Sequence, residues 1–229
     1  MLQAVGFDLD WTLSYYPLST IDVLREALVR CDCPRDLLGD LEGAAERYNA
    51  RWLEWERTIL EADPLRRRIV ASLLADAGVT NRSLVVPIAA AYGEVRQESG
   101  VLAFPGVVRL LADLKGRYRL GLLTNGQSQM QWEKIRALGF DETFDVILVA
   151  GEIGLYKPDA RIFERMLREW EVPAFAALFV GDSYDTDIVG AGGAGMRTAW
   201  IAAEDEVVPG AIQPTLRRSQ VAQLRGDLL

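Results

Sequence analysis

The sequence of 229 residues contains no histidine at all and only two cysteines, Cys31 and Cys33. The absence of histidine excludes Ser-His-Asp hydrolysis, Cys-His nucleophiles, histidine-bound zinc and HExxH proteases. Acid and base catalysis must then come from carboxylates, lysine or tyrosine. The two cysteines are one residue apart, too close for an ordinary disulfide and too few for a zinc site, so we expect a protein of the reducing cytoplasm.

The sequence also lacks a basic surplus, a long apolar run and an N-terminal targeting segment. The 25 Lys and Arg residues face 33 Asp and Glu residues, which gives a formal charge of -8. We therefore expect no binding to nucleic acid or to an anionic membrane. No apolar stretch approaches the length of about 18 residues that indicates a membrane span, and no signal peptide is recognised. The composition, 50% hydrophobic and 25% charged, is ordinary for a globular protein with a sizeable core.

Short segments rich in β-branched and aromatic residues alternate with helical patterns, which predicts an α/β fold with a doubly wound parallel sheet. The expected strands are residues 2–9, 118–123, 146–149, 177–180 and 197–201. Only helical periodicity is found between the first two of them. The predicted organisation is therefore an α/β core domain of residues 1–14 and 101–229 with an inserted α-helical cap domain of residues 15–100.

The cap segment shows start signals and apolar stripes of several helices. Ser19 to Asp22 is similar to a capping box, Asp63-Pro64 predicts another helix start, and a further helix is expected near Ser83. One long stripe, expected to be packing core rather than substrate contact, consists of Leu41, Ala45, Tyr48, Trp52, Trp55 and Ile59. The tail from Glu204 is expected to be loop-like.

Acidic residues follow two of the expected strands. Asp8 and Asp10 come at the end of the first strand, and they start on the same side because side chains alternate along a strand. Asp182, Asp185 and Asp187 follow the fourth strand. Ligands of open parallel sheets bind beyond the carboxyl ends of the strands. Such crowding is repulsive unless a cation lies among the carboxylates, whose oxygens favour Mg²⁺, so we predict a metal site.

Two other strand ends carry groups that suit an anion. Thr124 and Asn125 end the second strand just before a helix that is expected to start near Gln127 or Ser128. A hydroxyl with backbone N–H groups at a helix N-terminus can bind an anion. Lys157, in the loop after the third strand, is one of only three lysines beside 22 arginines, which indicates a need for a compact ammonium. Together with the carboxylates, these groups favour phosphoryl transfer.

With these motifs, the sequence resembles the haloacid dehalogenase superfamily, specifically a phosphatase-like member with a helical cap inserted after the first strand. The resemblance covers essentially the whole chain and implies the sheet order 5-4-1-2-3. It rests on Asp8-Leu9-Asp10-Trp11-Thr12, Leu122-Leu123-Thr124-Asn125-Gly126, Tyr156-Lys157-Pro158, and Gly181-Asp182-Ser183 with Asp187. Trp11 is bulkier than the residue usual at that position in similar sequences.

The resemblance implies a role for each of these residues. Asp8 is expected to attack phosphorus and form an aspartyl-phosphate, while Asp10 protonates the leaving oxygen and later deprotonates the attacking water. Thr124 and the backbone of Asn125 are expected to hold phosphoryl oxygens, and Lys157 steadies the nucleophile and the developing charge. The Mg²⁺ cofactor is expected to be bound by the Asp8 carboxylate, the Asp10 carbonyl, Asp182 and Asp187.

The function expected from these residues is Mg²⁺-dependent hydrolysis of a small phosphorylated metabolite, a nucleotide or a sugar phosphate, by a monomer or homodimer. Alternatives of the same fold are a 2-haloacid dehalogenase, which needs no metal, and a phosphosugar mutase. Alternatives of other classes are a receiver-like phospho-acceptor domain, which has no inserted cap, and a nucleotide-sugar transferase with a D-x-D metal site. The last leaves Thr124, Lys157 and Asp182 without a role.

Overall fold

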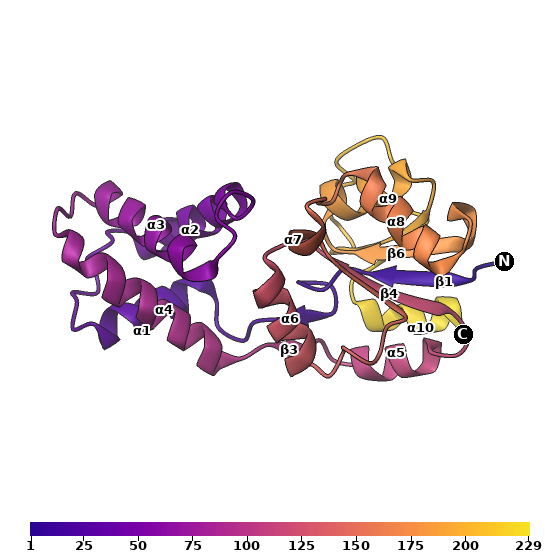
Figure 1. Cartoon of the computed structure of the whole chain (residues 1–229), viewed down its shortest axis with the longest axis horizontal. Helices are drawn as coiled ribbons and strands as arrows, with labels where there is room; N and C mark the ends of the chain where they lie inside the picture. The colour runs from indigo at the N-terminus through magenta and orange to yellow at the C-terminus, as the bar shows by residue number, and fades with distance from the viewer. The chain divides into compact units, whose positions relative to one another are not determined.

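The computed structural model describes all residues from Met1 to Leu229, which form two compact units (Figure 1). The core unit combines Met1–Tyr15 with Val101–Leu229, and the cap unit is Tyr16–Gly100. Tyr15, which the sequence analysis assigned to the cap, lies in the core unit. The reason is a small antiparallel pairing of β2 (Ser14–Tyr15) with β3 (Leu102–Ala103), in which Tyr15 lies opposite Leu102.

The core unit is built on a six-stranded parallel sheet with the order β5-β4-β1-β6-β7-β8. These strands are β1 (Ala4–Phe7), β4 (Arg119–Thr124), β5 (Val146–Val149), β6 (Ala177–Gly181), β7 (Arg197–Ile201) and β8 (Leu216–Arg218). Without β8, and with the five expected strands numbered along the chain, the order is 3-2-1-4-5. This is the expected order read from the opposite edge, so the predicted sheet, with its first strand in the interior, is confirmed.

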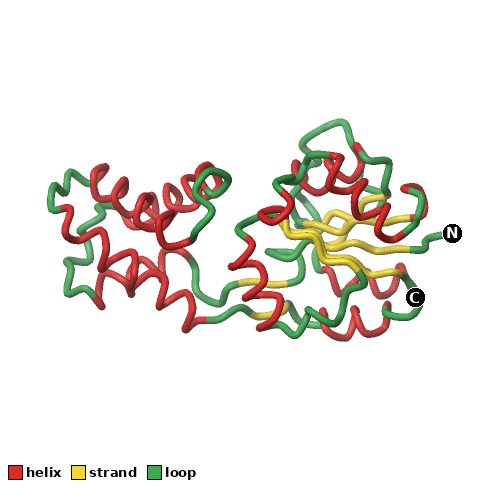
Figure 2. The backbone as a smooth tube through the Cα atoms, viewed as in Figure 1, coloured by secondary structure: helices red, strands yellow, loops and turns green.

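Helices cover both faces of this sheet (Figure 2). In the core unit they are α5 (Val107–Leu114), α6 (Ser128–Ala137), α7 (Ala150–Ile153), α8 (Ala160–Trp170), α9 (Val189–Gly193) and α10 (Arg225–Leu228). Side chains alternate between the two faces of the sheet along β1. Val5 and Phe7 therefore belong to one buried apolar cluster, and Ala4 belongs to another that contains Phe163 and Trp170 of α8. Because both faces are packed, polar groups gather at the strand ends.

The cap unit consists of four α-helices around one apolar cluster. They are α1 (Thr20–Arg30), α2 (Leu41–Trp55), α3 (Ala62–Asp76) and α4 (Val85–Ser99), the last preceded by the short helical turn η1 (Arg82–Leu84). The predicted cap at Ser19 is confirmed, since its side chain accepts a hydrogen bond from the Asp22 amide. The predicted start at Asp63-Pro64 is wrong, because α3 begins at Ala62 and leaves Pro64 in its first turn, where no N–H is needed.

Two other expectations need correction. The tail after Glu204 is not simply loop-like: it contains β8, the turn η4 (Val221–Leu224) and α10, and the buried Val221 and Leu224 pack into the same cluster as Phe7. These elements are too short to show a period in the sequence. Ile59 of the predicted stripe lies beyond the end of α2, although it still packs against the apolar cluster of the cap. No helix of the structure has the length and apolar character needed to span a membrane.

Candidate active site

A tight turn follows β1 and presents the first two carboxylates. The Asp8 amide donates to the Val180 carbonyl at 2.9 Å, which extends the pairing of β1 with β6 by one residue. The chain then turns back, and the amides of Leu13 and Ser14 both donate to the Leu9 carbonyl. Within the turn Trp11 has a φ of 65°, a left-handed conformation that bulky residues rarely adopt, and its side chain is 59% exposed. Strain of this kind is characteristic of functional sites.

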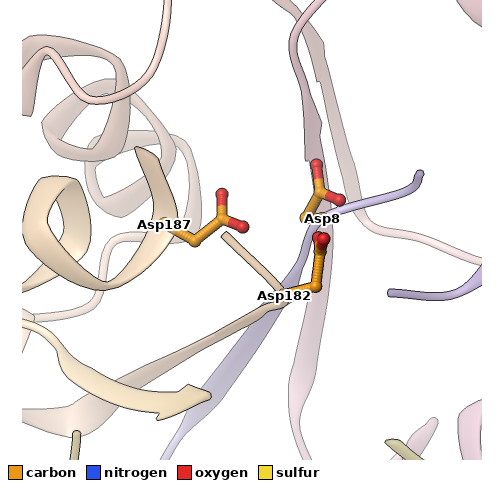
Figure 3. A group of neighbouring side chains, drawn as sticks. All are labelled: Asp8, Asp182 and Asp187. Carbon is orange, nitrogen blue, oxygen red and sulfur yellow. The ribbon is translucent and has the colours of Figure 1, made fainter. Parts of the chain in front are cut away.

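Asp8, Asp182 and Asp187 form the acidic group of the site, with one oxygen from each carboxylate within 4.8 Å of the others. Figure 3 shows that they come from the end of β1, the end of β6 and the π-helical turn η3 (Tyr184–Ile188). Gly181 permits this arrangement, because a Cβ there would lie 2.2 Å from an Asp187 oxygen. Asp185 of the predicted cluster is exposed and lies outside this group.

Lys157 provides the positive charge beside the acidic group. Its ammonium donates to Oδ1 of Asp8 and to Oδ1 of Asp187, each at 2.6 Å. The residue is only 2% exposed, and a buried lysine is tolerated when it is paired in this way. The structure therefore brings together four residues that the sequence analysis singled out from three separate segments.

One ammonium does not balance three carboxylates, and the pKa values reflect this. Burial raises the pKa of Asp8 well above its usual value; Lys157 acts in the opposite direction, and Asp187 and Asp182 add to the rise. Burial, with Asp187 next, raises the pKa of Asp182 to about 6. Burial opposes the charge of Lys157, but Asp187 and Asp8 outweigh it and raise the pKa of Lys157. The site thus lacks positive charge, which a divalent cation would supply.

Thr12, which the sequence analysis quoted in the first motif without assigning a role, holds Asp182 in place. Its hydroxyl donates to Oδ1 of Asp182 at 3.1 Å and accepts from the Asp182 amide at 3.0 Å. This reciprocal pair connects the turn after β1 with the end of β6. The signal in the sequence was the position of Thr12, two residues after Asp10.

Thr124 and Asn125 lie at the end of β4, as predicted. Thr124 is buried, and its hydroxyl donates to the Asn125 carbonyl at 3.1 Å. The Asn125 side chain binds the backbone of Lys157 twice: its amide donates to the Lys157 carbonyl at 3.1 Å, and its oxygen accepts from the Lys157 amide at 2.9 Å. The side chain of Asn125 therefore fixes the loop that carries Lys157.

Asp10 is the site residue whose surroundings the sequence analysis missed. Its carboxylate is not part of the acidic group; both its oxygens accept from the ammonium of Lys134, and one also accepts from the amide of Gln131. Both partners lie on α6, at positions i and i+3 of one helix face. The scarcity of lysine that drew attention to Lys157 applies equally to Lys134.

Comparisons with known proteins point to one family. Residues 71–201 match the family model described as haloacid dehalogenase-like hydrolase. A glyceraldehyde 3-phosphate phosphatase of Methanopyrus kandleri is 32% identical over 88% of this chain and 84% of its own length. A solved structure described as a 2-haloacid dehalogenase from Pseudomonas syringae pv. tomato is 30% identical, covering 100% of this chain and 98% of that one, with a TM-score of 0.69.

Other relatives match over shorter segments. The pyrimidine 5'-nucleotidase YjjG of Escherichia coli is 34% identical over 52% of this chain and 54% of its own length. The chain likewise spans about half the length, or less, of several other curated relatives that it matches. The names of these relatives differ in substrate, so the alignments identify a family and not one substrate.

Proposed function

We propose that this chain, which belongs to the haloacid dehalogenase-like hydrolase family, hydrolyses small phosphate monoesters with the help of Mg²⁺. The observation that carries the proposal is the buried Lys157 ammonium placed 2.6 Å from both Asp8 and Asp187 at the carboxyl ends of parallel strands. A phosphate monoester is a dianion, which a carboxylate nucleophile can approach only where positive charge offsets the repulsion.

The residues present fit Mg²⁺. The donors of the acidic group are all carboxylate oxygens, the ligand type that hard divalent cations prefer, and they lie close enough together to share one ion. The raised pKa values of Asp8 and Asp182 also indicate a shortage of positive charge. Asp8, Asp182 and Asp187 would therefore hold the ion, with the Asp10 carbonyl as the further ligand implied by the family resemblance. When bound, Mg²⁺ would offset the negative charge of the phosphoryl group.

The chain's own residues supply the remaining chemistry. An oxygen of Asp8, oriented by Lys157, attacks phosphorus, and the ester oxygen leaves with a proton from Asp10. Water then hydrolyses the aspartyl-phosphate, and its proton passes to Asp10. Proton transfer of this kind contributes roughly 10² to 10⁴ in rate. Thr124 and the Asn125 backbone lie at the end of β4, where they can bind the phosphoryl oxygens.

The test is phosphate release from a panel of phosphorylated metabolites, measured with Mg²⁺ and with EDTA. The names of the relatives select its first members: glyceraldehyde 3-phosphate and the pyrimidine 5'-nucleotides. We expect Mg²⁺-dependent turnover of at least one ester and a phosphorylated Asp8 in acid-quenched samples analysed by mass spectrometry. An enzyme that releases phosphate equally well in EDTA would contradict the proposal.

A second candidate function is hydrolysis of a 2-haloacid. The observation in its favour is the likeness to the 2-haloacid dehalogenase structure over the whole chain. Asp8 would then displace halide from carbon, and neither the acidic group nor Asp10 would have a clear task. Halide release from 2-chloropropionate in EDTA, with no phosphate release from any ester, would favour this candidate over the phosphatase.

A further inference from the structure

We propose that Lys134 and Gln131 are positioning residues. They hold the carboxylate of Asp10 at a fixed position relative to the end of β4, where the phosphoryl oxygens are proposed to bind. This inference rests on the proposed function, because it concerns the residue expected to transfer the proton. It assigns a task to a second lysine and to a glutamine of α6.

The contacts leave the Asp10 carboxylate little freedom. The Lys134 ammonium donates to Oδ1 at 2.8 Å and to Oδ2 at 2.7 Å, so it binds both oxygens at once. The Gln131 amide donates to Oδ2 at 3.0 Å. Rotation of the carboxylate about its side-chain bonds would break charge-assisted hydrogen bonds, which are stronger than neutral ones.

Gln131 also connects Asp10 to the predicted anion site. The same amide nitrogen donates to the Asn125 carbonyl at 2.6 Å, so one side chain joins the turn after β1 to the loop after β4. A general acid has to lie within hydrogen-bond reach of the leaving oxygen, whose position is set by the groups that bind the phosphoryl oxygens. By joining these two loops, Gln131 therefore controls the distance between the Asp10 carboxylate and the leaving oxygen of the substrate.

Burial makes this arrangement specific rather than incidental. Gln131 is 5% exposed and Lys134 is 8% exposed, although both belong to types that usually remain at the surface. Their partner Asp10 is 121 and 124 residues away in sequence, so the contact comes from the fold and not from local helix chemistry. A misplacement of about 1 Å in a catalytic group can lower the rate by roughly as much as 10²-fold.

The experiment compares two substrates that differ in their need for an acid. Alkyl phosphates require protonation of the leaving oxygen, whereas acetyl phosphate releases acetate without it. We measure kcat/KM, which reports only the steps up to departure of the first product, for the best alkyl ester of the panel and for acetyl phosphate. Lys134→Met should lower the alkyl value by roughly 10- to 100-fold and the acetyl phosphate value by less than about threefold.

Lys115→Met is the matched control. Lys115 is exposed, and its ammonium donates to the Glu142 carbonyl, so this variant should behave as wild type with both substrates. In an Asp10→Ala background, Lys134→Met should change kcat/KM by less than about twofold, because residues that act through one another are not additive.

The outcomes separate this inference from the proposed function. If wild type releases no phosphate from any ester, the proposed function fails first. If wild type is active but Lys134→Met slows both substrates equally, or slows the Asp10→Ala protein further, Lys134 is a structural residue and the inference is wrong. If Lys134→Met does not fold, Lys134→Gln takes its place in the same two measurements, with the same criteria and an expected loss of roughly 10-fold on the alkyl ester.

Discussion

The two units of the chain bury different kinds of side chain. Every buried polar or charged residue belongs to the core unit, and most of them lie around the acidic group, Lys157 and Asp10. The buried residues of the cap unit are aliphatic side chains, alanines and the two stacked tyrosines Tyr48 and Tyr92. Buried polar groups reduce stability unless they are fully paired, whereas apolar burial adds to it directly.

Buried polar contacts of the core unit thus form its candidate site, whereas buried apolar contacts stabilise the cap unit. In the core unit, three buried or half-buried carboxylates lie together beside one ammonium, which bonds two of them. The pKa values of Asp8 and Asp182 are raised, chiefly because burial disfavours their charged forms. A folded protein keeps such an arrangement when the site serves a function. Substitutions in the two units should therefore differ in kind: those in the core site should change chemistry, and those in the cap interior should change stability.

The largest expected effect is that of Asp8→Asn on turnover. Removing the proposed nucleophile should lower kcat by at least roughly 10³-fold. The melting temperature should not fall, because an amide removes one of the carboxylates whose charged form burial disfavours. The measurements are phosphate release and thermal unfolding without Mg²⁺. A fully active variant would show that Asp8 is not the nucleophile and that the acidic group of the core unit does not serve catalysis.

The opposite pattern is expected for Leu73→Ala in the cap interior. Leu73 of α3 is 0% exposed, and truncation of a fully buried leucine costs about 2 to 5 kcal/mol through lost burial and the cavity left behind. Urea unfolding followed by tryptophan fluorescence measures this loss. The exposed Leu53→Ala on α2 is the control and should stay within about 0.5 kcal/mol of wild type. Equal losses for the two variants would show that cap packing is not what stabilises this unit.

The sequence predicted the parts of the fold and site that carry strong local signals. The strand ends with Asp8, Thr124 and Asp182 were recognisable because an apolar run ends at each in a polar motif. β8 escaped prediction because it has three residues and lies at the sheet edge. The contacts of Asp10 escaped it because no periodicity connects a turn near the N-terminus with one face of α6.

The expected effect of Mg²⁺ on stability depends on pH. Because the pKa of Asp182 is about 6 in the folded chain and 3.8 is its ordinary value, the folded state binds more protons between these values. Stability of the metal-free protein due to this group therefore falls as pH rises from about 4 to about 6. Mg²⁺ favours the ionised carboxylates, so it should raise the melting temperature more at about pH 7.5 than at about pH 5.

Differential scanning fluorimetry with and without Mg²⁺ at the two pH values measures this effect. Asp182→Asn is the control, and it should reduce the difference between the two pH values. The cap variant Leu73→Ala should retain the whole difference, because the acidic group lies in the core unit. If Mg²⁺ raised the melting temperature equally at both pH values, the inference that the acidic group lacks positive charge would be wrong.

The smallest expected effect concerns a polar group that the cap unit does use for stability. The Ser19 hydroxyl accepts from the Asp22 amide at 3.2 Å and so caps α1. Ser19→Ala should lower the free energy of unfolding by about 1 kcal/mol, because an orphan amide of the first turn loses its partner. Ser19→Asn should retain most of the stability, and the exposed Arg35→Ala should have almost no effect. Urea unfolding of the three variants measures these differences in the free energy of unfolding. If Ser19→Asn lost as much stability as Ser19→Ala, the cap hydrogen bond would contribute nothing.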